Sequence, residues 1–337
     1  MKLADFHFDL PDDLIAQAPL ADRAASRMLV VDRQTGSLRD SFFRELPQYV
    51  GPGDVLVFNN TRVLPARLHG KRSGGGACET LLVKKVSDTP LRWEALVRPG
   101  KKIRVGDVLT YEGGLQAHVV DRGEFGLRTL EFTPAEAFEA TVQQIGRMPL
   151  PPYIKRSDED EAADRERYQT VYARNTGSAA APTAGLHFTP AILDAVRARG
   201  AQTAEITLHV GLGTFQPIHS DDIEAHSMHS ESFSIPPDAV KTIESAKRVL
   251  AIGTTSVRTL EHWARSGETQ GETDIFLYPG KDLHRVDAIL TNFHLPDSTL
   301  ILLVAAFLGK DKTLAAYHHA IEQKYRFYSY GDCMLIA

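Results

Sequence analysis

The sequence has 337 residues, of which 43% are hydrophobic and 24% are charged, and its net charge is −5. This length predicts about two domains, and this composition is typical of a folded globular protein rather than a disordered one. The longest apolar run, residues 300–308, is far shorter than the ~20 residues that span a bilayer, so we expect no membrane partner. The chain has only two cysteines, which predicts no disulfide framework and a reducing, cytoplasmic location.

The first part of the chain alternates short strand signals with turns. Residues 27–43 predict a β-hairpin, because two apolar runs flank a Gln-Thr-Gly turn. Residues 51–70 then read as an apolar strand, the turn-prone residues 59–61 and a second strand.

From residue 66 to about 130 the pattern becomes entirely β. Five short runs of strand-forming residues are separated by Gly, Pro and Asp. We expect a small barrel or sandwich that is inserted into the chain. The predicted domains are a core made of residues 1–65 and 149–337, and an inserted barrel-like domain of residues 66–148.

This segment is basic, although the chain as a whole is acidic. Residues 66–130 contain 12 Lys or Arg and 7 Asp or Glu. Four of these cations, Arg98, Lys101, Lys102 and Arg104, fall within seven residues. Such a cluster is usually a solvated loop, and the alternative is a surface that contacts a polyanion.

Strands and helices alternate in the second part of the core. Thr189 is a candidate N-cap, Pro190 suits the first helical position and Gly200 is the expected stop. Strands are expected at about 204–210, 249–253, 274–280 and 286–293, with helices between and after them and a last strand at the end of the chain. This order predicts an α/β fold with a mainly parallel sheet, either open or closed into a barrel.

Small or polar residues follow each of these strands, where parallel α/β folds bind their ligands. They are His209, Gly211, Gly213 and Thr214; Gly253, Thr254, Thr255 and Ser256; Pro279 and Gly280; and Asn292, Phe293 and His294. Turns use the same residue types, but four such exits in succession indicate a pocket. The second exit also begins a helix, whose free N–H groups suit an anion or a carboxylate.

Residues 177–190, GSAAAPTAGLHFTP, carry little side-chain bulk and then place an imidazole before a helix. Small residues let a ligand or another backbone approach closely. We expect Thr183, Gly185 and His187 to line the floor of the pocket, next to a helix N-terminus that favours negative charge. Tight packing of a capped helix between domains explains the segment equally well.

His226, His229 and Glu231 have the residue types of a metal site. Their spacing matches no zinc signature and a strand-like run follows them, so we expect no metal and prefer a hydrogen-bonding or structural role. The sequence also lacks the glycine pattern of a dinucleotide fold, a P-loop and a G-x-S-x-G nucleophile turn.

Eight segments together resemble one family. They are residues 14–36, 55–70, 167–190, 207–218, 226–236, 252–261, 291–309 and 325–336. In strings such as VLVFNNTRVLPARLHG and TNFHLPDSTLILLVAAFLG, the chain closely resembles the S-adenosylmethionine:tRNA ribosyltransferase-isomerases of queuosine biosynthesis.

The resemblance implies a specific reaction. The family transfers the ribosyl part of S-adenosylmethionine to 7-aminomethyl-7-deazaguanine at the wobble position of tRNA. It isomerises the sugar to an epoxycyclopentane, which gives epoxyqueuosine and releases adenine and methionine. S-adenosylmethionine is then a substrate, and neither a cofactor nor a metal is expected.

This chemistry needs a base beside the sulfonium, a donor that helps adenine to leave and an unprotonated amine, and imidazoles suit these roles near neutral pH. The resemblance makes His187, His209 and His294 the first catalytic candidates. An aromatic face for the sulfonium would come from Phe188, Phe215 or Phe293. The expected substrate-binding residues are Thr183, Gly185, Gly211, Gly213, Thr254, Thr255, Ser256, Asn292, His226, His229 and Glu231.

A wobble base lies in a single-stranded loop, where proteins contact splayed bases and phosphates. We therefore expect Arg98, Lys101, Lys102 and Arg104 to contact the tRNA. Two other functions stay open from the residues alone: a metal-dependent hydrolase that uses the His226 group, and a non-catalytic RNA-binding protein that uses the basic β domain. Neither explains a resemblance along the whole chain.

Overall fold

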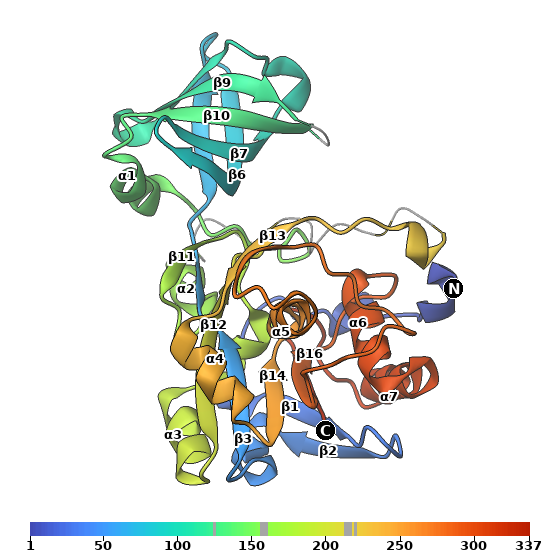
Figure 1. The fold of residues 1–337 in the computed structure, drawn as a ribbon. Helices are drawn as coiled ribbons and strands as arrows, with labels where there is room; N and C mark the ends of the chain where they lie inside the picture. Colours follow the sequence, from blue (N-terminus) through green and yellow to red (C-terminus); the bar gives the residue numbers. More distant parts are fainter. Residues whose placement is uncertain (124–125, 156–160, 212–217, 219–220) are drawn as a thin grey trace.

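The computed structural model describes residues 1–123, 126–155, 161–211, 218 and 221–337. Figure 1 shows a β-barrel at one end of the molecule and a larger α/β body that holds both chain termini. Within the described residues the barrel has six strands and closes on itself, and the body is built on an open sheet of nine strands. The predicted α/β core with a small β-barrel is confirmed, and of the two alternatives for the core sheet the open one is correct.

The sheet of the body is mixed, with a parallel centre. Its strands are β1 (Arg27–Val31), β2 (Leu38–Phe42), β3 (Asp54–Asn59), β12 (Gln202–Leu208), β13 (Glu231–Ser234), β14 (Arg248–Ile252), β15 (Gln270–Thr273), β16 (Ala288–Asn292) and β17 (Cys333–Ile336). Their order is β15-β13-β12-β3-β14-β16-β17-β1-β2. Strands β12, β3, β14 and β16 run parallel to one another, so their carboxyl ends meet at one edge. Strand β17 is antiparallel to β16, and β2, β13 and β15 are antiparallel to their neighbours.

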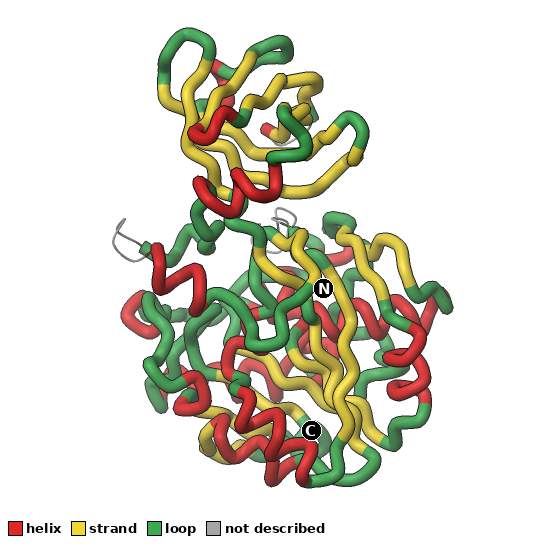
Figure 2. The backbone as a smooth tube through the Cα atoms, turned by 90° about the vertical axis from the view of Figure 1, so that its left-hand side faces the viewer, coloured by secondary structure: helices red, strands yellow, loops and turns green. Residues whose placement is uncertain are grey.

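Helices cover both faces of this sheet (Figure 2). Residues of β3 alternate between the faces: Val55 and Val57 belong to one hydrophobic cluster, Leu56 and Phe58 to another. The first cluster includes residues of α4 (Pro237–Glu244), α5 (Thr254–Ser266), α6 (Thr299–Leu308) and α7 (Lys310–Glu322). The second includes residues of α3 (Pro190–Ala198) and of the 3-10 helix η4 (Phe43–Tyr49). Burial on both faces explains why the central strands are continuous apolar runs.

The remaining helices are short. They are α1 (Phe138–Ile145), α2 (Glu161–Arg167) and the 3-10 helices η1 (Leu3–Phe6), η2 (Asp12–Leu14), η3 (Arg23–Ala25), η5 (Gly100–Lys102), η6 (Glu112–Gly114), η9 (Thr183–His187) and η11 (Ile223–Ala225). No helix in the described ranges has both the length and the apolar surface that crossing a membrane requires.

The barrel is antiparallel, and its strands lie side by side in the order β10-β7-β6-β5-β8-β9. They are β5 (Arg67–Arg72), β6 (Ala77–Asp88), β7 (Leu91–Arg98), β8 (Val108–Tyr111), β9 (Gln116–Arg122) and β10 (Leu127–Thr133). The chain enters the barrel beside the point where it leaves, because Arg67 and Arg147 exchange two backbone hydrogen bonds, of 3.1 and 2.8 Å. Phe138 of α1 packs on Trp93 of the barrel, with ring centroids 5.6 Å apart.

The predicted start of α3 is confirmed. The side chain of Thr189 accepts a hydrogen bond from the Ile192 N–H at 3.2 Å, and Pro190 is the first helical residue. The hairpin β1–β2 and the last strand, β17, also form where the sequence predicts them.

The strand predicted at residues 274–280 is wrong. This segment has no strand, and β15 ends just before it. Within this segment a side chain, and not a neighbouring strand, bonds the carbonyl oxygen of Ile275, which accepts a hydrogen bond from Arg258 Nε at 3.3 Å. Pro279 and Gly280 therefore do not mark a strand end.

A buried carboxylate fixes α5 against the segment that leads into β16. Glu261 of α5 has no exposed surface. Its Oε1 accepts hydrogen bonds from the Arg285 and Val286 N–H groups, at 2.9 and 3.0 Å. Its Oε2 accepts one from the His284 N–H at 2.8 Å and pairs with Arg265 at 3.1 Å. These four donors offset the cost of burying the charge and set the position of β16 relative to α5.

We expect Glu261→Gln to lower the free energy of unfolding by about 1–3 kcal/mol, because the new amide NH₂ group faces backbone donors and leaves one of them unsatisfied. Denaturant unfolding of the variant and the wild type measures this difference. The matched control is Glu244→Gln, at an exposed position of α4, which should stay within about 0.5 kcal/mol of the wild type. Equal stability of E261Q and wild type would contradict the structural role of the carboxylate.

Candidate active site

Two cavities lie near the carboxyl edge of the central strands, and both have sizes typical of small-molecule sites. The larger, of 710 Å³, lies between the barrel and the body, and we call it the barrel-side cavity. Its walls include Lys84, Lys85, Trp93, Phe138, Thr176, Gly177, His209, Gly211, His229, Glu231 and Glu272. The smaller, of 400 Å³, is lined by the body, and we call it the core cavity. Its walls include Ala180, Thr183, Val210, Gly253, Thr254, Thr255, Asn292, His294, Asp297 and Tyr328.

Two adjacent segments form a wall that both cavities share. The Ala179 N–H donates a hydrogen bond to the Val210 carbonyl at 2.9 Å, which holds the segments side by side. Gly177 and His209 line the barrel-side cavity, whereas Ala180 and Val210 line the core cavity. The two cavities therefore adjoin each other along these two segments.

His209 stands in this wall, directly after β12, and is half-buried. Its Nδ1 lies 2.8 Å from Thr61 Oγ1, on the short strand β4 (Thr61–Val63). The ring lies against Gly177, in the strand β11 (Asn175–Ser178) that pairs with β4; a Cβ on Gly177 would come within 2.9 Å of His209 Cε1. The missing side chain of Gly177 thus makes room for the imidazole. Burial lowers the pKa of His209, so at neutral pH the ring is unprotonated and able to accept a proton.

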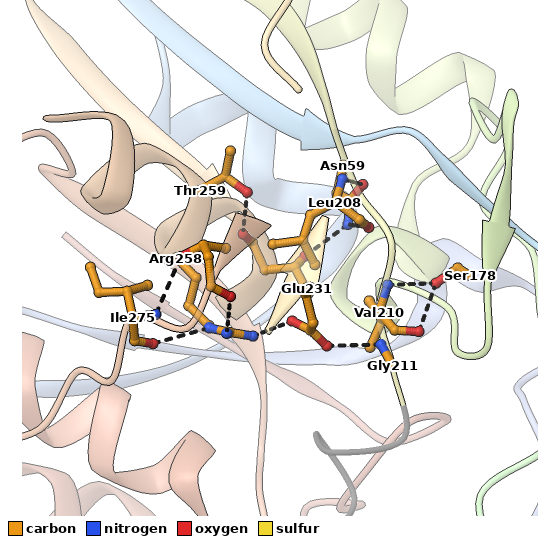
Figure 3. A network of polar contacts seen from close by, with 11 residues as sticks. Asn59, Ser178, Leu208, Val210, Gly211, Glu231, Arg258, Thr259 and Ile275 are labelled. Carbon is orange, nitrogen blue, oxygen red and sulfur yellow. Dashed lines mark hydrogen bonds and ion pairs between the residues drawn. The ribbon is translucent and has the colours of Figure 1, made fainter. Parts of the chain in front are cut away.

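A buried ion pair lies beside the barrel-side cavity (Figure 3). Glu231, at the start of β13, accepts a hydrogen bond from the Gly211 N–H at 2.8 Å and pairs with Arg258 of α5. Both charged residues are 4% exposed. Arg258 also donates to the carbonyl oxygens of Thr273 and Ile275, at 3.4 and 3.3 Å. Such a pair persists in the interior only when further hydrogen bonds hold it, and here they fix the backbone at Gly211.

The core cavity takes its polar groups from the ends of β14 and β16. His294 is 8% exposed, and its Nε2 lies 2.9 Å from Thr291 Oγ1. Burial lowers the pKa of His294 to about 3, which suits a neutral hydrogen-bonding partner better than a base. Thr254 and Thr255 line this cavity from the first turn of α5, and Thr183 lines it from η9.

The predicted site residues His187, Gly185 and Ser256 lie outside the walls of both cavities. The His187 ring is 4% exposed, with Nδ1 2.9 Å from Ser26 Oγ and Nε2 3.3 Å from Asn292 Nδ2. Burial, with smaller effects of Arg326 and Arg23, lowers the pKa of His187 to about 3. A Cβ on Gly185 would lie 1.9 Å from the Tyr172 hydroxyl, and the buried Ser256 donates its hydroxyl to the Ile252 carbonyl at 2.8 Å. All three have packing roles in this structure.

Of the remaining predicted residues, some line a cavity and others pack against neighbouring side chains. His229 is exposed and lines the barrel-side cavity, whereas the His226 ring packs against Phe276 with centroids 5.2 Å apart. Gly213 and Phe215 lie outside the described residues. Phe188 and Phe293 have no exposed surface, so the expectation that either ring faces a sulfonium is wrong. No cluster of three or more His, Cys, Asp or Glu that could hold a metal is found in the part of the chain that the structure describes.

The basic cluster of the barrel lies away from both cavities. Arg98, Lys101, Lys102 and Arg104 are exposed at the end of β7 and in the loop after it, and none of them pairs with a carboxylate of the described residues. Such unpaired cations are available to a polyanion.

Sequence reasoning missed Asn59 and Thr61, which it assigned only to a turn. Asn59 has no exposed surface; its Nδ2 donates to the Leu208 carbonyl at 2.9 Å and to Thr255 Oγ1 at 3.2 Å. Their position in the sequence could have identified them. Asn59 and Thr61 lie at the carboxyl end of β3, as His209, Gly253 and Asn292 lie at the carboxyl ends of β12, β14 and β16.

Comparisons with known proteins agree with this architecture. The family model described as queuosine biosynthesis protein matches residues 3–336. The S-adenosylmethionine:tRNA ribosyltransferase-isomerase of Solibacter usitatus (strain Ellin6076) is 54% identical over the full length of both chains. The crystal structure of the S-adenosylmethionine tRNA ribosyltransferase of Thermotoga maritima is similar with a TM-score of 0.56 and 37% identity, covering 99% of this chain and 100% of that one. By the extent of the family match and this identity, the chain belongs to the family of queuosine biosynthesis proteins.

Proposed function

We propose that this protein transfers and isomerises the ribosyl group of S-adenosylmethionine onto 7-aminomethyl-7-deazaguanine at the wobble position of a tRNA, giving epoxyqueuosine, adenine and methionine. Family membership supports the reaction class. The observation that carries the proposal is the pair of cavities with a shared wall at Gly177–Ala180 and His209–Val210. A two-substrate transfer has to hold its donor and its acceptor side by side, and two adjoining cavities offer a place for each.

The acceptor base enters the barrel-side cavity. A nucleotide that leaves a single-stranded loop needs an opening large enough for a base and its sugar, aromatic surface and nearby cations. The cavity of 710 Å³ between barrel and body offers Trp93 and Phe138 together with Lys84 and Lys85. S-adenosylmethionine takes the core cavity, where the first turn of α5 is able to receive its carboxylate.

His209 acts as the base beside the sulfonium. It is the predicted catalytic histidine that stands in the shared wall, and its lowered pKa keeps it unprotonated at neutral pH. His294, neutral and in the core cavity, holds the adenosine by hydrogen bonding. The scheme consumes S-adenosylmethionine as a substrate and routes no step through a metal or a cofactor.

The tRNA backbone lies along the barrel, on Arg98, Lys101, Lys102 and Arg104. Their exposure and lack of carboxylate partners in the described residues support this contact.

We also propose the domain limits 1–65, 66–148 and 149–337. The chain enters the barrel at Arg67 and leaves it at Arg147, and the pairing of these two residues supports the limits. A cytoplasmic location fits the two free cysteines and a tRNA substrate.

Product analysis tests the proposed reaction. Purified protein with S-adenosylmethionine and tRNA that carries the aminomethyl-deazaguanine should release adenine and methionine together, and unmodified tRNA should release neither. Chromatography of the small-molecule products measures this. S-adenosylhomocysteine as the product would mean a methyltransferase, and tRNA binding without turnover would favour a binding protein.

His209→Ala should lower kcat by about 10²–10⁴-fold, because the reaction loses its general base. In the wild type, kcat/KM should fall toward acid pH as the imidazole becomes protonated. Since burial lowers the pKa of His209 from the ordinary 6.5, the midpoint of that fall should lie below pH 6.5. The control is His318→Ala, an exposed histidine of α7 that should keep wild-type turnover. An H209A enzyme with full activity would reject this assignment.

The double charge reversal Lys101→Glu and Lys102→Glu should weaken tRNA binding. It should also reduce the slope of log affinity against log salt by about 1.5, since two phosphate contacts are lost. Affinity for S-adenosylmethionine should not change. The matched control is Arg44→Glu with Lys324→Glu, two exposed cations of the body. Equal effects of the two double variants would mean that only net charge matters and that the barrel surface is not the contact.

A further inference from the structure

One carboxylate of the core cavity has no role in the scheme above. Asp297 lies in the turn between β16 and α6 and lines this cavity. Its backbone has φ of +58°, a left-handed conformation that Asp tolerates better than most residues. The turn therefore presents an ionisable side chain at the mouth of a site that is otherwise lined by small, apolar and neutral polar groups.

A residue from the far end of the chain holds the Asp297 side chain. His7 Nδ1 lies 2.8 Å from Asp297 Oδ2, and this hydrogen bond raises the pKa of His7. The second oxygen, Oδ1, has no hydrogen-bond partner among the described residues, and the side chain is 38% exposed. One oxygen thus orients the carboxylate, and the other stays available to a ligand.

A second acceptor in the same cavity is also unmatched. Asn292 is 2% exposed, and its Nδ2 donates to the Tyr328 carbonyl at 3.1 Å and lies 3.3 Å from His187 Nε2. Its Oδ1 is buried and receives no hydrogen bond from the described residues. A buried acceptor without a donor leaves its partial negative charge uncompensated, and this adds to the preference of the cavity for a cationic group.

The start of α5 gives the same cavity a group of reverse polarity. Gly253, Thr254 and Thr255 line the cavity where α5 begins, and α5 has 13 residues. The first N–H groups of such a helix lack intrahelical acceptors and carry a partial positive charge. The start of α5 therefore favours a carboxylate, and Asp297 in the same cavity favours a cationic donor.

We propose that Asp297 is the specificity-determining residue that binds the α-ammonium group of S-adenosylmethionine. The inference rests on the proposed function and deepens it, because it assigns the amino-acid end of the donor to the core cavity. The α-carboxylate faces the first turn of α5, and the α-ammonium donates to Asp297 Oδ1. The adenosine part then extends toward the shared wall and His209.

Calorimetric titration of the full chain tests this assignment with two ligands. One is S-adenosylmethionine, and the other is its deamino analogue, which keeps the sulfonium, the adenosine and the carboxylate but has hydrogen in place of the amino group. Asp297→Asn should weaken S-adenosylmethionine binding by about 10-fold or more, the range of a hydrogen bond between charged groups. The analogue should bind the wild type and D297N equally.

The control is Asp9→Asn, an exposed aspartate near His7 that lines neither cavity and should leave both affinities unchanged. If D297N does not fold, Asp297→Ser takes its place, and this variant should lose the preference for S-adenosylmethionine over the analogue that the wild type shows. The inference is overturned if D297N binds S-adenosylmethionine like the wild type, or if both ligands weaken equally. Adenine release by the wild type with modified tRNA is scored separately, so a failure at Asp297 is distinguishable from a failure of the proposed reaction.

Discussion

The buried amide of Asn59 holds together the edge of the sheet on which both cavities depend. Its Oδ1 accepts hydrogen bonds from the Leu208 and Thr61 N–H groups, at 3.0 and 3.2 Å, while its Nδ2 reaches the Leu208 carbonyl and Thr255. One side chain therefore joins the ends of β3 and β12 to the start of α5. An amide without access to water is costly unless both of its ends are bonded, so this position specifies the arrangement of three segments at once.

Each cavity has a carboxylate in its lining, Glu231 in the barrel-side cavity and Asp297 in the core cavity, and the two carboxylates have different partners. In the barrel-side cavity the carboxylate of Glu231 is neutralised by Arg258 and committed to the Gly211 N–H, so it shapes the backbone more than it attracts a cation. In the core cavity one oxygen of the Asp297 carboxylate has no hydrogen-bond partner among the described residues, and the start of α5 lines the same cavity. The first arrangement tolerates a large polyanion nearby, and the second suits a small zwitterion.

The sequence predicts what is local and misses what distant segments bring together. The cap at Thr189, the hairpin and the barrel strands follow from neighbouring residues, and the structure agrees. Local pattern does not separate His187 from His209: both lie in family motifs, but Ser26 and Asn292 enclose the first, whereas Gly177 leaves the second beside a cavity. The segment 274–280, predicted as a strand, also contacts a residue that local pattern does not reveal. Its Ile275 carbonyl oxygen accepts a hydrogen bond from Arg258, which belongs to the preceding helix α5.

Burial also distinguishes the two histidines that line the cavities, His209 and His294. A cationic sulfonium repels a protonated imidazole, so a histidine beside it has to be neutral, and desolvation lowers the pKa of both His209 and His294. A base must also pass its proton on after each turnover. His209 is half-buried in the wall of the larger cavity and meets this condition, whereas His294, at 8% exposure, does not. These two properties support the proposal that His209, rather than His294, acts as the base.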